Sequence, residues 1–336
     1  MWNRRSWVHL LDNDNSLRHG LVVCLALIVL TLFVPLNAFA QDRLVIGYGG
    51  VSGVHLPLWV TKELGLFEKH QLRGDVVMVP GGARQMQALI GGSIQFSHID
   101  STAPVTAIQR GADLVIVAGA LNKFPFSIVT QKEIRQPADL IGKRIGIVNF
   151  GGQNELSVIL ALREWKIPRE AVNIVPSGGS DSRLVALSTK ALDATLLSPP
   201  QTITAETQGF RILAQMGDLK ASFPLDTVVT TRSFLKQNRD IVKRFLRAYI
   251  DGLYAIRTNK ERTIAVLHKT LREGNRAILE STYQYYAPLF SIPPRVSREG
   301  LRTTADFFAA KPEMDKFLDE SLIDELEKEG LFKGTR

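Results

Sequence analysis

The stretch that decides the fold of this chain covers residues 43–70 and reads RLVIGYGGVSGVHLPLWVTKELGLFEKH. Its short apolar run, residues 44–46, has the length of a strand that is buried on both faces. The glycines that follow leave the backbone free to turn and to approach another molecule closely. Pro57 suits the first turn of a helix, and Gly65 suits its end. The stretch is therefore predicted to form a strand, a glycine-rich loop and a helix.

The glycine-rich loop is the first candidate binding segment. In an open α/β sheet such a loop lies at the carboxyl end of its strand, where ligands bind. Ser52 and His55 are its side chains that can make polar contacts. The alternative is an ordinary connection between a strand and a helix. A dinucleotide site is not predicted, because no G-x-G-x-x-G precedes the helix.

The first 40 residues are predicted to be a secretory signal peptide. Arginines supply positive charge, residues 21–36 form an apolar segment, and Ala38 and Ala40 complete a small-x-small pattern. We expect cleavage after Ala40 and a periplasmic mature chain. An uncleaved membrane anchor is the alternative, although the apolar segment is short for a membrane span.

Composition excludes several other classes of protein. The chain has 336 residues, of which 45% are hydrophobic and 22% charged, as in globular proteins. Its single cysteine, Cys24, lies in the predicted signal, so the mature chain has no disulfide, thiolate nucleophile or cysteine metal site. The formal net charge of +8 is scattered and forms no basic stripe interleaved with aromatic residues, so no nucleic-acid partner is predicted. A mild positive field favours anionic ligands or an anionic membrane surface.

The strand–loop–helix pattern recurs after the opening stretch. Further strands are predicted at residues 75–79, 94–98 and 114–118, with helices between them. Three strand ends lead into loops rich in glycine or small polar residues, at 49–53, 80–82 and 100–102. Because carboxyl ends of parallel strands share one edge, these loops are expected to lie together.

A second set of strands repeats this organisation. Residues 126–130 read as a strand without a helical partner, and strands at 144–148, 173–175 and 193–197 then lead into loops at 149–152, 177–181 and 198–200. A strand at 227–230 brings the chain back. Two α/β lobes are therefore predicted. Beyond them the sequence indicates helices at 240–258, 260–271, 275–287, 298–310 and 321–328.

Short motifs carry a family resemblance over nearly the whole mature chain. They are residues 57–59 (PLW), 62–68 (KELGLFE), 88–93 (ALIGGS), 139–146 (DLIGKRIG), 183–187 (RLVAL), 193–194 (DA), 198–200 (SPP) and 322–330. With them the chain resembles periplasmic solute-binding proteins of the nitrate/sulfonate/taurine class of ABC importers. More narrowly, it resembles the group related to thiamine-pyrimidine precursor binders.

The resemblance implies an α/β fold of the two-lobed periplasmic-binding-protein type (type II). Each lobe would be an open sheet flanked by helices, and the first would carry a helical C-terminal extension. Carried onto this chain, the first lobe is residues 41–122 plus 227–336, and the second is 123–226. The implied function is a monomeric receptor that captures a small anionic or polar organic solute and delivers it to an ABC importer, comprising a membrane permease and its cytoplasmic ATPase. No cofactor and no catalysis are implied.

The resemblance also implies ligand contacts from both lobes. They are Ser52, Gly53, His55, Gly81, Gly82, Asp100, Ser101, Thr102, Asn149, Gly151, Gly152, Gln153, Gly178, Gly179, Asp181, Ser198 and Gln201. Sulfonate binders commonly place a hydroxyl residue where this chain has Gly152, so the solute class stays open. The helix that begins at Gln153 is expected to offer free amide hydrogens to an anion, unless Glu155 already occupies them.

Two other functions stay open, an enzyme on the same fold and a sensor that presents its ligand to a membrane receptor. His55, His98 and Asp100 follow two strands of one lobe and can converge, which makes a metal site or a catalytic pair conceivable. A capped or solvent-facing histidine is the commoner arrangement. No G-x-S-x-G or HExxH motif supports catalysis.

Overall fold

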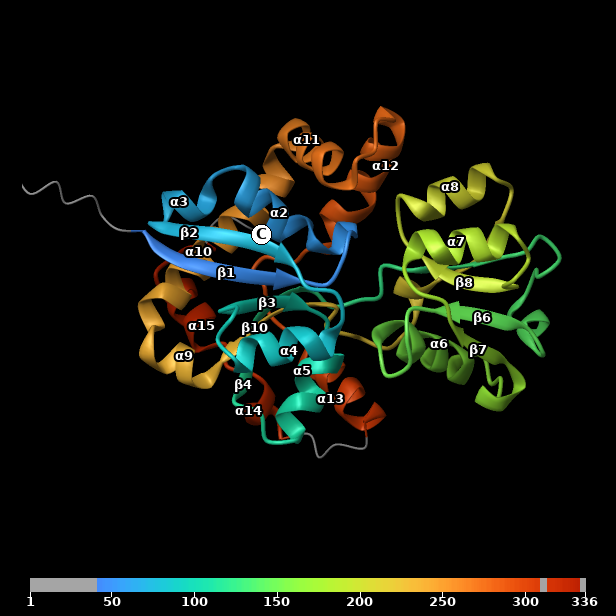
Figure 1. Cartoon of the computed structure of the whole chain (residues 1–336), viewed down its shortest axis with the longest axis horizontal. Coiled ribbons are helices and arrows are strands. Elements are labelled where there is room, and N and C mark those ends of the chain that lie inside the picture. The colour runs from blue at the N-terminus through green and yellow to red at the C-terminus, as the bar shows by residue number, and fades with distance from the viewer. Residues whose placement is uncertain (1–40, 309–312, 333–336) are drawn as a thin grey trace, which may run out of the picture. The chain divides into compact units, whose positions relative to one another are not determined.

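The computed structural model describes residues 41–308 and 313–332 (Figure 1). The predicted signal peptide, residues 1–40, and the last part of the helix predicted at 298–310 lie outside the described residues. Within the described ranges, no helix is long and apolar enough to cross a membrane.

The first lobe is built on a five-stranded sheet with the order β2-β1-β3-β10-β4. Strand β1 is parallel to β2 and β3, whereas β10 is antiparallel to both of its neighbours. Every residue of β4 is buried, as expected for a strand covered on both faces. The strands are β1 Asp42–Tyr48, β2 Leu72–Met78, β3 Phe96–Ile99, β4 Leu114–Leu121 and β10 Asp226–Thr231.

The second lobe repeats this plan with the order β7-β6-β8-β5-β9. Here β5 is the antiparallel strand, and it occupies the position that β10 has in the first sheet. The predicted two-lobed fold is confirmed. Strand β9 was not predicted, because it is short and only partly buried along one edge. The strands are β5 Ser127–Thr130, β6 Arg144–Ile147, β7 Asn173–Pro176, β8 Ala194–Leu197 and β9 Arg211–Gln215.

Helices cover both faces of the first sheet (Figure 1). The longest, α10, presents an apolar stripe that includes Val242, Phe245 and Tyr249, and it packs against α2 and α3. The ring of Phe245 stacks on that of Phe96 in β3 with centroids 3.9 Å apart. These helices are α2 Leu56–Glu63, α3 Leu66–Lys69, α4 Gly82–Ile90, α5 Thr102–Gln109, α9 Arg232–Gln237 and α10 Arg239–Thr258.

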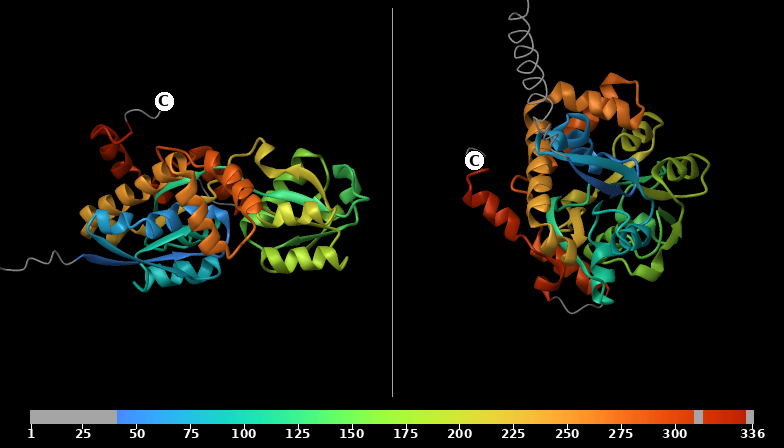
Figure 2. Two further views of the ribbon diagram at one scale, coloured as in Figure 1. Left: turned by 90° about the horizontal axis from the view of Figure 1, so that it is seen from above. Right: turned by 60° about the vertical axis from the view of Figure 1, so that its left-hand side comes forward.

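The C-terminal part of the chain is helical, as predicted, and returns to the first lobe (Figure 2). Side chains of Asn259, Asn275 and Ser297 accept hydrogen bonds from first-turn amides and so cap three of these helices. The short α9 and α14 were not predicted, since neither is long enough to show a helical period. The C-terminal helices are α11 Lys260–Leu271, α12 Arg276–Tyr286, α13 Arg298–Phe307, α14 Met314–Phe317 and α15 Ser321–Lys328.

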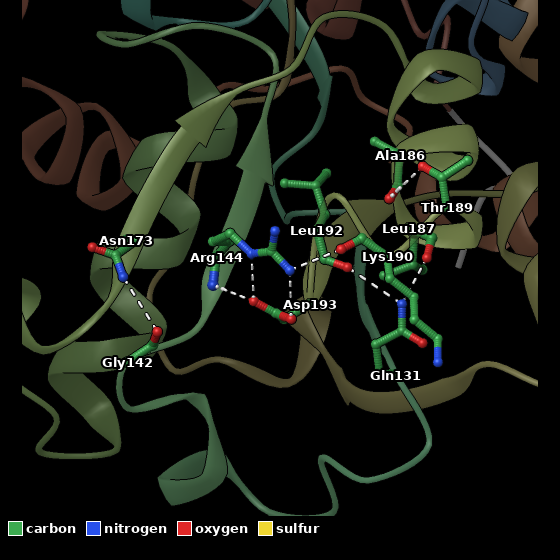
Figure 3. A network of polar contacts seen from close by, with 10 residues as sticks. All are labelled: Gln131, Gly142, Arg144, Asn173, Ala186, Leu187, Thr189, Lys190, Leu192 and Asp193. Carbon is green, nitrogen blue, oxygen red and sulfur yellow. Dashed lines mark hydrogen bonds and ion pairs between the residues drawn. The ribbon is translucent and has the colours of Figure 1, made fainter.

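In the second lobe, α6 Gln153–Glu164 lies on one face of the sheet, and α7 Ser180–Ser188 and α8 Gln201–Thr207 lie on the other (Figure 1). An ion pair fixes the amino ends of β6 and β8 (Figure 3). Arg144 Nε and Nη2 donate to the Asp193 carboxylate over 2.9 and 3.0 Å, and Nη2 also donates to the Lys190 carbonyl. These hydrogen bonds from Arg144 lower the pKa of Asp193.

Two chain crossings connect the sheets, between β4 and β5 and again between β9 and β10. The crossings are hydrogen-bonded to each other, because Phe223 N donates to the carbonyl of Asn122 and Leu225 N to that of Leu121. The Asn122 side chain also donates to the Arg295 carbonyl over 2.9 Å and accepts from the Ser297 amide over 2.7 Å. The first crossing is therefore held to the loop before α13.

Candidate functional site

A cavity of about 940 Å³ is lined by loops at the carboxyl ends of strands in both sheets. Its position agrees with the general rule for ligand sites in open α/β sheets. The predicted contact residues that line it come from both lobes. They are Ser52, His55, Gly81, Gly82, Asp100, Thr102, Asn149, Gly151, Gly152, Gln153, Gly179 and Ser198.

The other predicted contact residues do not line this cavity and instead support its loops. A side chain at Gly53 would overlap the ring of Tyr286, so this glycine admits the packing of α12. Ser101 Oγ lies 2.9 Å from Thr304 Oγ1 in the interior. Gln201 Nε2 donates to Asp181 Oδ1 over 2.9 Å at an exposed position. The carbonyl of Gly178 accepts a hydrogen bond from Arg183.

Buried polar atoms without a hydrogen-bond partner among the described residues gather around the cavity. They include Nε2 of Gln85, Nε of Arg183, Oε1 of Gln153 and Oδ1 of Asn154, and all four residues line it. A buried polar group that is left unpaired costs about 1–3 kcal/mol. Such groups are therefore uncommon unless a further molecule satisfies them. Their concentration beside one cavity shows that the interior of its walls is polar.

Arg183 on α7 is the principal cation of the cavity wall. Its side chain is 3% exposed, and its other guanidinium nitrogens donate to the carbonyls of Gly178 and Leu196 and weakly to Ser180 Oγ. No described carboxylate forms an ion pair with it. Burial lowers the pKa of Arg183 to about 10, which still leaves it charged at neutral pH. The Asp181 carboxylate acts on the guanidinium from beyond ion-pair distance and partly opposes the effect of burial on its pKa. A buried cation whose direct partners are neutral favours an anion beside it.

The N-terminus of α6 lies on the same wall of the cavity. Gly151 has a positive φ of 71°, which a residue with a side chain rarely adopts, and Gly152 is the N-cap. Glu155 Oε2 accepts from the Gly151 amide over 2.6 Å, so this carboxylate does occupy one of the free donors. The amides of Gln153 and Asn154 form no hydrogen bond with any described residue. Two first-turn donors therefore remain for a ligand.

The two predicted histidines do converge, but with a different carboxylate. His55 Nδ1 lies 2.8 Å from His98 Nδ1, and His98 Nε2 lies 2.8 Å from Asp226 Oδ1. Asp100 is engaged elsewhere, because it accepts from the amide and hydroxyl of Thr102. Burial raises the pKa of Asp100 despite these bonds. Among the described residues, no group of three or more His, Cys, Asp or Glu side chains is arranged to hold a metal ion.

Protonation of His55 provides a test of this cluster. Burial, together with the neighbouring His98, lowers the pKa of His55 well below its ordinary 6.5. Below pH 6.5 the unfolded chain therefore binds a proton that the folded chain does not, so stability is lost as the pH falls through this window. We expect the free energy of unfolding to drop by up to ~1.4 kcal/mol per pH unit from this group.

The measurement is urea unfolding of the wild type and His55→Gln between pH 7.5 and 5. The variant should show a shallower loss of stability than the wild type over this range. Parallel curves for the two proteins would contradict a depressed pKa at His55.

Apolar side chains surround the polar part of the cavity. Val51, Ile90, Val148 and Phe150 line it, and each is more than one third exposed. Two belong to the first lobe and two to the second. Exposed apolar side chains gathered at one cleft are typical of ligand-binding surfaces. They suit a solute with a hydrocarbon portion as well as a polar one.

Two residues that line the cavity were not among the predicted ligand contacts. Arg183 was noticed only as part of a family motif, and Gln85 was not singled out. Arg183 lies about one helical turn after the glycines of the loop at 177–181. Because side chains on a helix lean toward its N-terminus, this spacing could have indicated that Arg183 reaches back to the ends of the strands. No signal in the sequence shows that Gln85 is buried at the cavity.

Two lobes of this topology, with a polar cleft at the strand ends, define the periplasmic-binding-protein class of fold. Residues 52–262 match the NMT1/THI5 like family, and the chain belongs to that family. The match covers more than half of the chain and includes the loops of both lobes.

Individual relatives agree with this assignment. The chain is 29% identical to a binding protein of Brucella abortus over 220 residues. These residues are 63% of this chain and 66% of the Brucella protein, so the chain spans slightly less than two thirds of that relative's length. It is also 29% identical to the taurine-binding periplasmic protein of Escherichia coli over 51% of this chain and 53% of the other. The crystal structure of the periplasmic aliphatic sulphonate binding protein SsuA from Escherichia coli shares the fold. It has a TM-score of 0.68 at 24% identity and covers 84% of this chain and 91% of that one.

Proposed function

We propose that this protein is an extracytoplasmic solute receptor that binds a small organic anion between its two lobes and delivers it to an ABC importer. The observation that carries the proposal is the wall formed by Arg183 and the α6 N-terminus, which offers a buried charge and free donors to the cleft. The exposed apolar side chains at the same cleft support an organic solute over a bare inorganic ion.

Binding without chemical change is part of the proposal. The relatives described above are named as binding proteins, and the names of two of them also give a ligand and a periplasmic location. Among the described residues His55 is hydrogen-bonded to His98 and to no hydroxyl group, so no nucleophile–base pair supports catalysis at this position. The partners we propose are the membrane permease of an ABC importer and its ATPase, with the receptor acting as a monomer.

The receptor is tested by isothermal titration calorimetry of the exported protein with taurine, ethanesulfonate and nitrate. We expect saturable binding of one molecule per chain for at least one of these probes, with the compound recovered unchanged after dissociation. Detection of a converted product would instead support an enzyme on this fold. Absence of binding for all three would contradict a solute from the nitrate, sulfonate and taurine group.

Export implies a defined mature N-terminus. We predict that the periplasmic protein begins at Gln41, after the small-x-small pattern that ends at Ala40. Intact-mass spectrometry of protein from the periplasmic fraction should give the mass of residues 41–336. Retention of residues 1–40 would contradict cleavage and favour a membrane-anchored receptor.

Closure of the lobes is the motion that the proposal requires. We propose lobes at residues 41–122 plus 227–336 and at 123–226, which bend at 121–123 and 221–226, because hinges concentrate rotation in a few connecting residues. The radius of gyration from X-ray scattering should decrease when a probe that calorimetry shows to bind is added to saturation. Superimposable scattering curves with and without the saturating probe would contradict closure.

A further inference from the structure

A buried chain of polar contacts runs from Asp226 through two histidines to the cleft. The side chains of Asp226 and His98 are 0% and 1% exposed, and Nε2 of His98 lies 2.8 Å from the carboxylate. The Tyr249 hydroxyl donates to the same carboxylate from α10. Because it gives its hydrogen to Asp226, this hydroxyl, which also lies 3.3 Å from Nε2 of His98, can only accept from that nitrogen. His98 then meets His55 through their Nδ1 atoms, 2.8 Å apart. His55 is the member of this chain that lines the cavity.

The carboxylate determines which ring nitrogen carries each proton. An ionised carboxylate only accepts hydrogen bonds, so Nε2 of His98 must carry a hydrogen. In neutral His98 the Nδ1 atom is then an acceptor, and Nδ1 of His55 must donate to it. Neutral His55 has one ring hydrogen, which this bond uses. Its Nε2 therefore carries a lone pair.

The free nitrogen of His55 is open to the cleft. Nε2 of His55 forms no hydrogen bond with any described residue, and it is not among the fully enclosed polar atoms that lack a partner. Since His55 lines the cavity, a solute can reach this atom. Burial beside His98 lowers the pKa of His55, which agrees with a neutral ring at physiological pH.

We propose that Asp226 and His98 hold His55 in its Nδ1–H form, so that Nε2 accepts a hydrogen bond in the cleft and selects solutes that carry an N–H or O–H group. The selection of solutes rests on the proposed function, whereas the state of the rings does not. The solute class that follows is a small organic anion with a hydrogen-bond donor. Its anionic group would meet Arg183 and α6 in one lobe, and its donor would meet His55 in the other. His98 and Asp226 are positioning residues.

The direct test is ¹⁵N NMR of the histidine rings in the exported protein at pH 7.5. We expect His55 to carry its hydrogen on Nδ1 and His98 to carry it on Nε2. A His55 ring with its hydrogen on Nε2 would overturn the proposal. This measurement needs no solute, so it separates a failure of this inference from a failure of the proposed receptor function.

A variant tests whether His98 sets the state of His55. In His98→Leu no acceptor faces Nδ1 of His55, so nothing holds the hydrogen there and His55 should change to the Nε2–H form. A His55 ring that keeps Nδ1–H in a folded variant would overturn the role of His98. His70→Gln is the matched control, because His70 pairs with Asp251 and is not part of the cavity lining, and it should leave the signals of His55 unchanged. If His98→Leu does not fold, the wild-type spectrum still decides the proposal.

Selectivity is tested by calorimetry with isethionate and ethanesulfonate at pH 7.5. Both probes are anions with a sulfonate on a two-carbon chain, and isethionate adds an O–H donor. We expect isethionate to bind at least ~10-fold more tightly, and we expect His55→Phe to remove most of this ratio. Equal or tighter binding of ethanesulfonate by the wild type would overturn the selection. If neither probe binds, the sulfonate part of the proposed function is contradicted, and the ring spectrum still decides the inference.

Discussion

Replacing Arg183 by methionine should weaken the binding of an anionic solute by at least ~100-fold, which corresponds to ~2.7 kcal/mol. The guanidinium is buried in the cavity wall, and among the described residues no carboxylate lies within ion-pair distance of it, although Asp181 acts on it from farther away. A bound anion would supply that partner in a poorly solvated place, where removing one member of a charge pair costs about 2–5 kcal/mol. The affinity is measured by calorimetry with the probe that the wild type binds most tightly.

Folding must be measured in parallel, because Arg183 also donates to two backbone carbonyls. Circular dichroism and urea unfolding show whether the variant is native. Arg144→Met is the matched control on the same lobe. It breaks the ion pair with Asp193 at the amino ends of the strands (Figure 3). Neither residue lines the cavity. Such a partly exposed pair contributes about 0–1 kcal/mol to stability, and its loss should leave affinity unchanged. A folded Arg183→Met protein that binds like the wild type would refute the role of Arg183.

Replacing Gly152 by aspartate should weaken anion binding by at least ~10-fold, or ~1.4 kcal/mol. The substitution places a carboxylate at the N-cap of α6, where it would compete with the solute for the amides of Gln153 and Asn154. The backbone accepts the change, because Gly152 has a negative φ and a new Cβ would meet mainly the Asn149 side chain, 3.3 Å away. Aspartate is a favoured N-cap residue, so stability should be preserved.

Gly152→Asn is the control for this variant. Asparagine has the same shape and also caps helices, but it adds no charge. Calorimetry should therefore show a much smaller loss of affinity for asparagine than for aspartate. Equal losses would indicate steric obstruction in place of charge repulsion. Wild-type affinity in the aspartate variant would show that the anion does not bind at this helix.

Much of the fold followed from local sequence patterns. Helix α10 has a long apolar stripe, so its helical period can be recognised in the sequence. The strands of the first sheet are short apolar runs bounded by glycine or small polar residues, which also allows their prediction. Strand β9 and helix α14 were missed because short elements take their structure from tertiary contacts, which a local pattern does not contain. The order of the strands within each sheet was not predicted, because no local pattern contains it.

The candidate site was predicted at the level of loops and less well at the level of side chains. His98 was expected beside Asp100, which is two residues away, but its carboxylate partner is Asp226 at the second crossing. That pairing depends on β10 lying antiparallel to β3, and no local pattern specifies it. Gly53 was expected to meet a ligand, whereas it makes room for Tyr286 from a helix far along the chain. Contacts across the topology are the part that sequence reasoning did not provide.

The measurement that tests the central claim most directly is mass spectrometry of the small molecules released from freshly purified protein. The wild type and Arg183→Met should be isolated from the same periplasmic extract conditions and denatured without prior dialysis. The account predicts that a single organic anion is released from the wild type in proportion to protein, unchanged by incubation with it, and is depleted from the variant. An uncharged or cationic molecule, an anion recovered equally from both proteins, or a product formed from it would contradict the account.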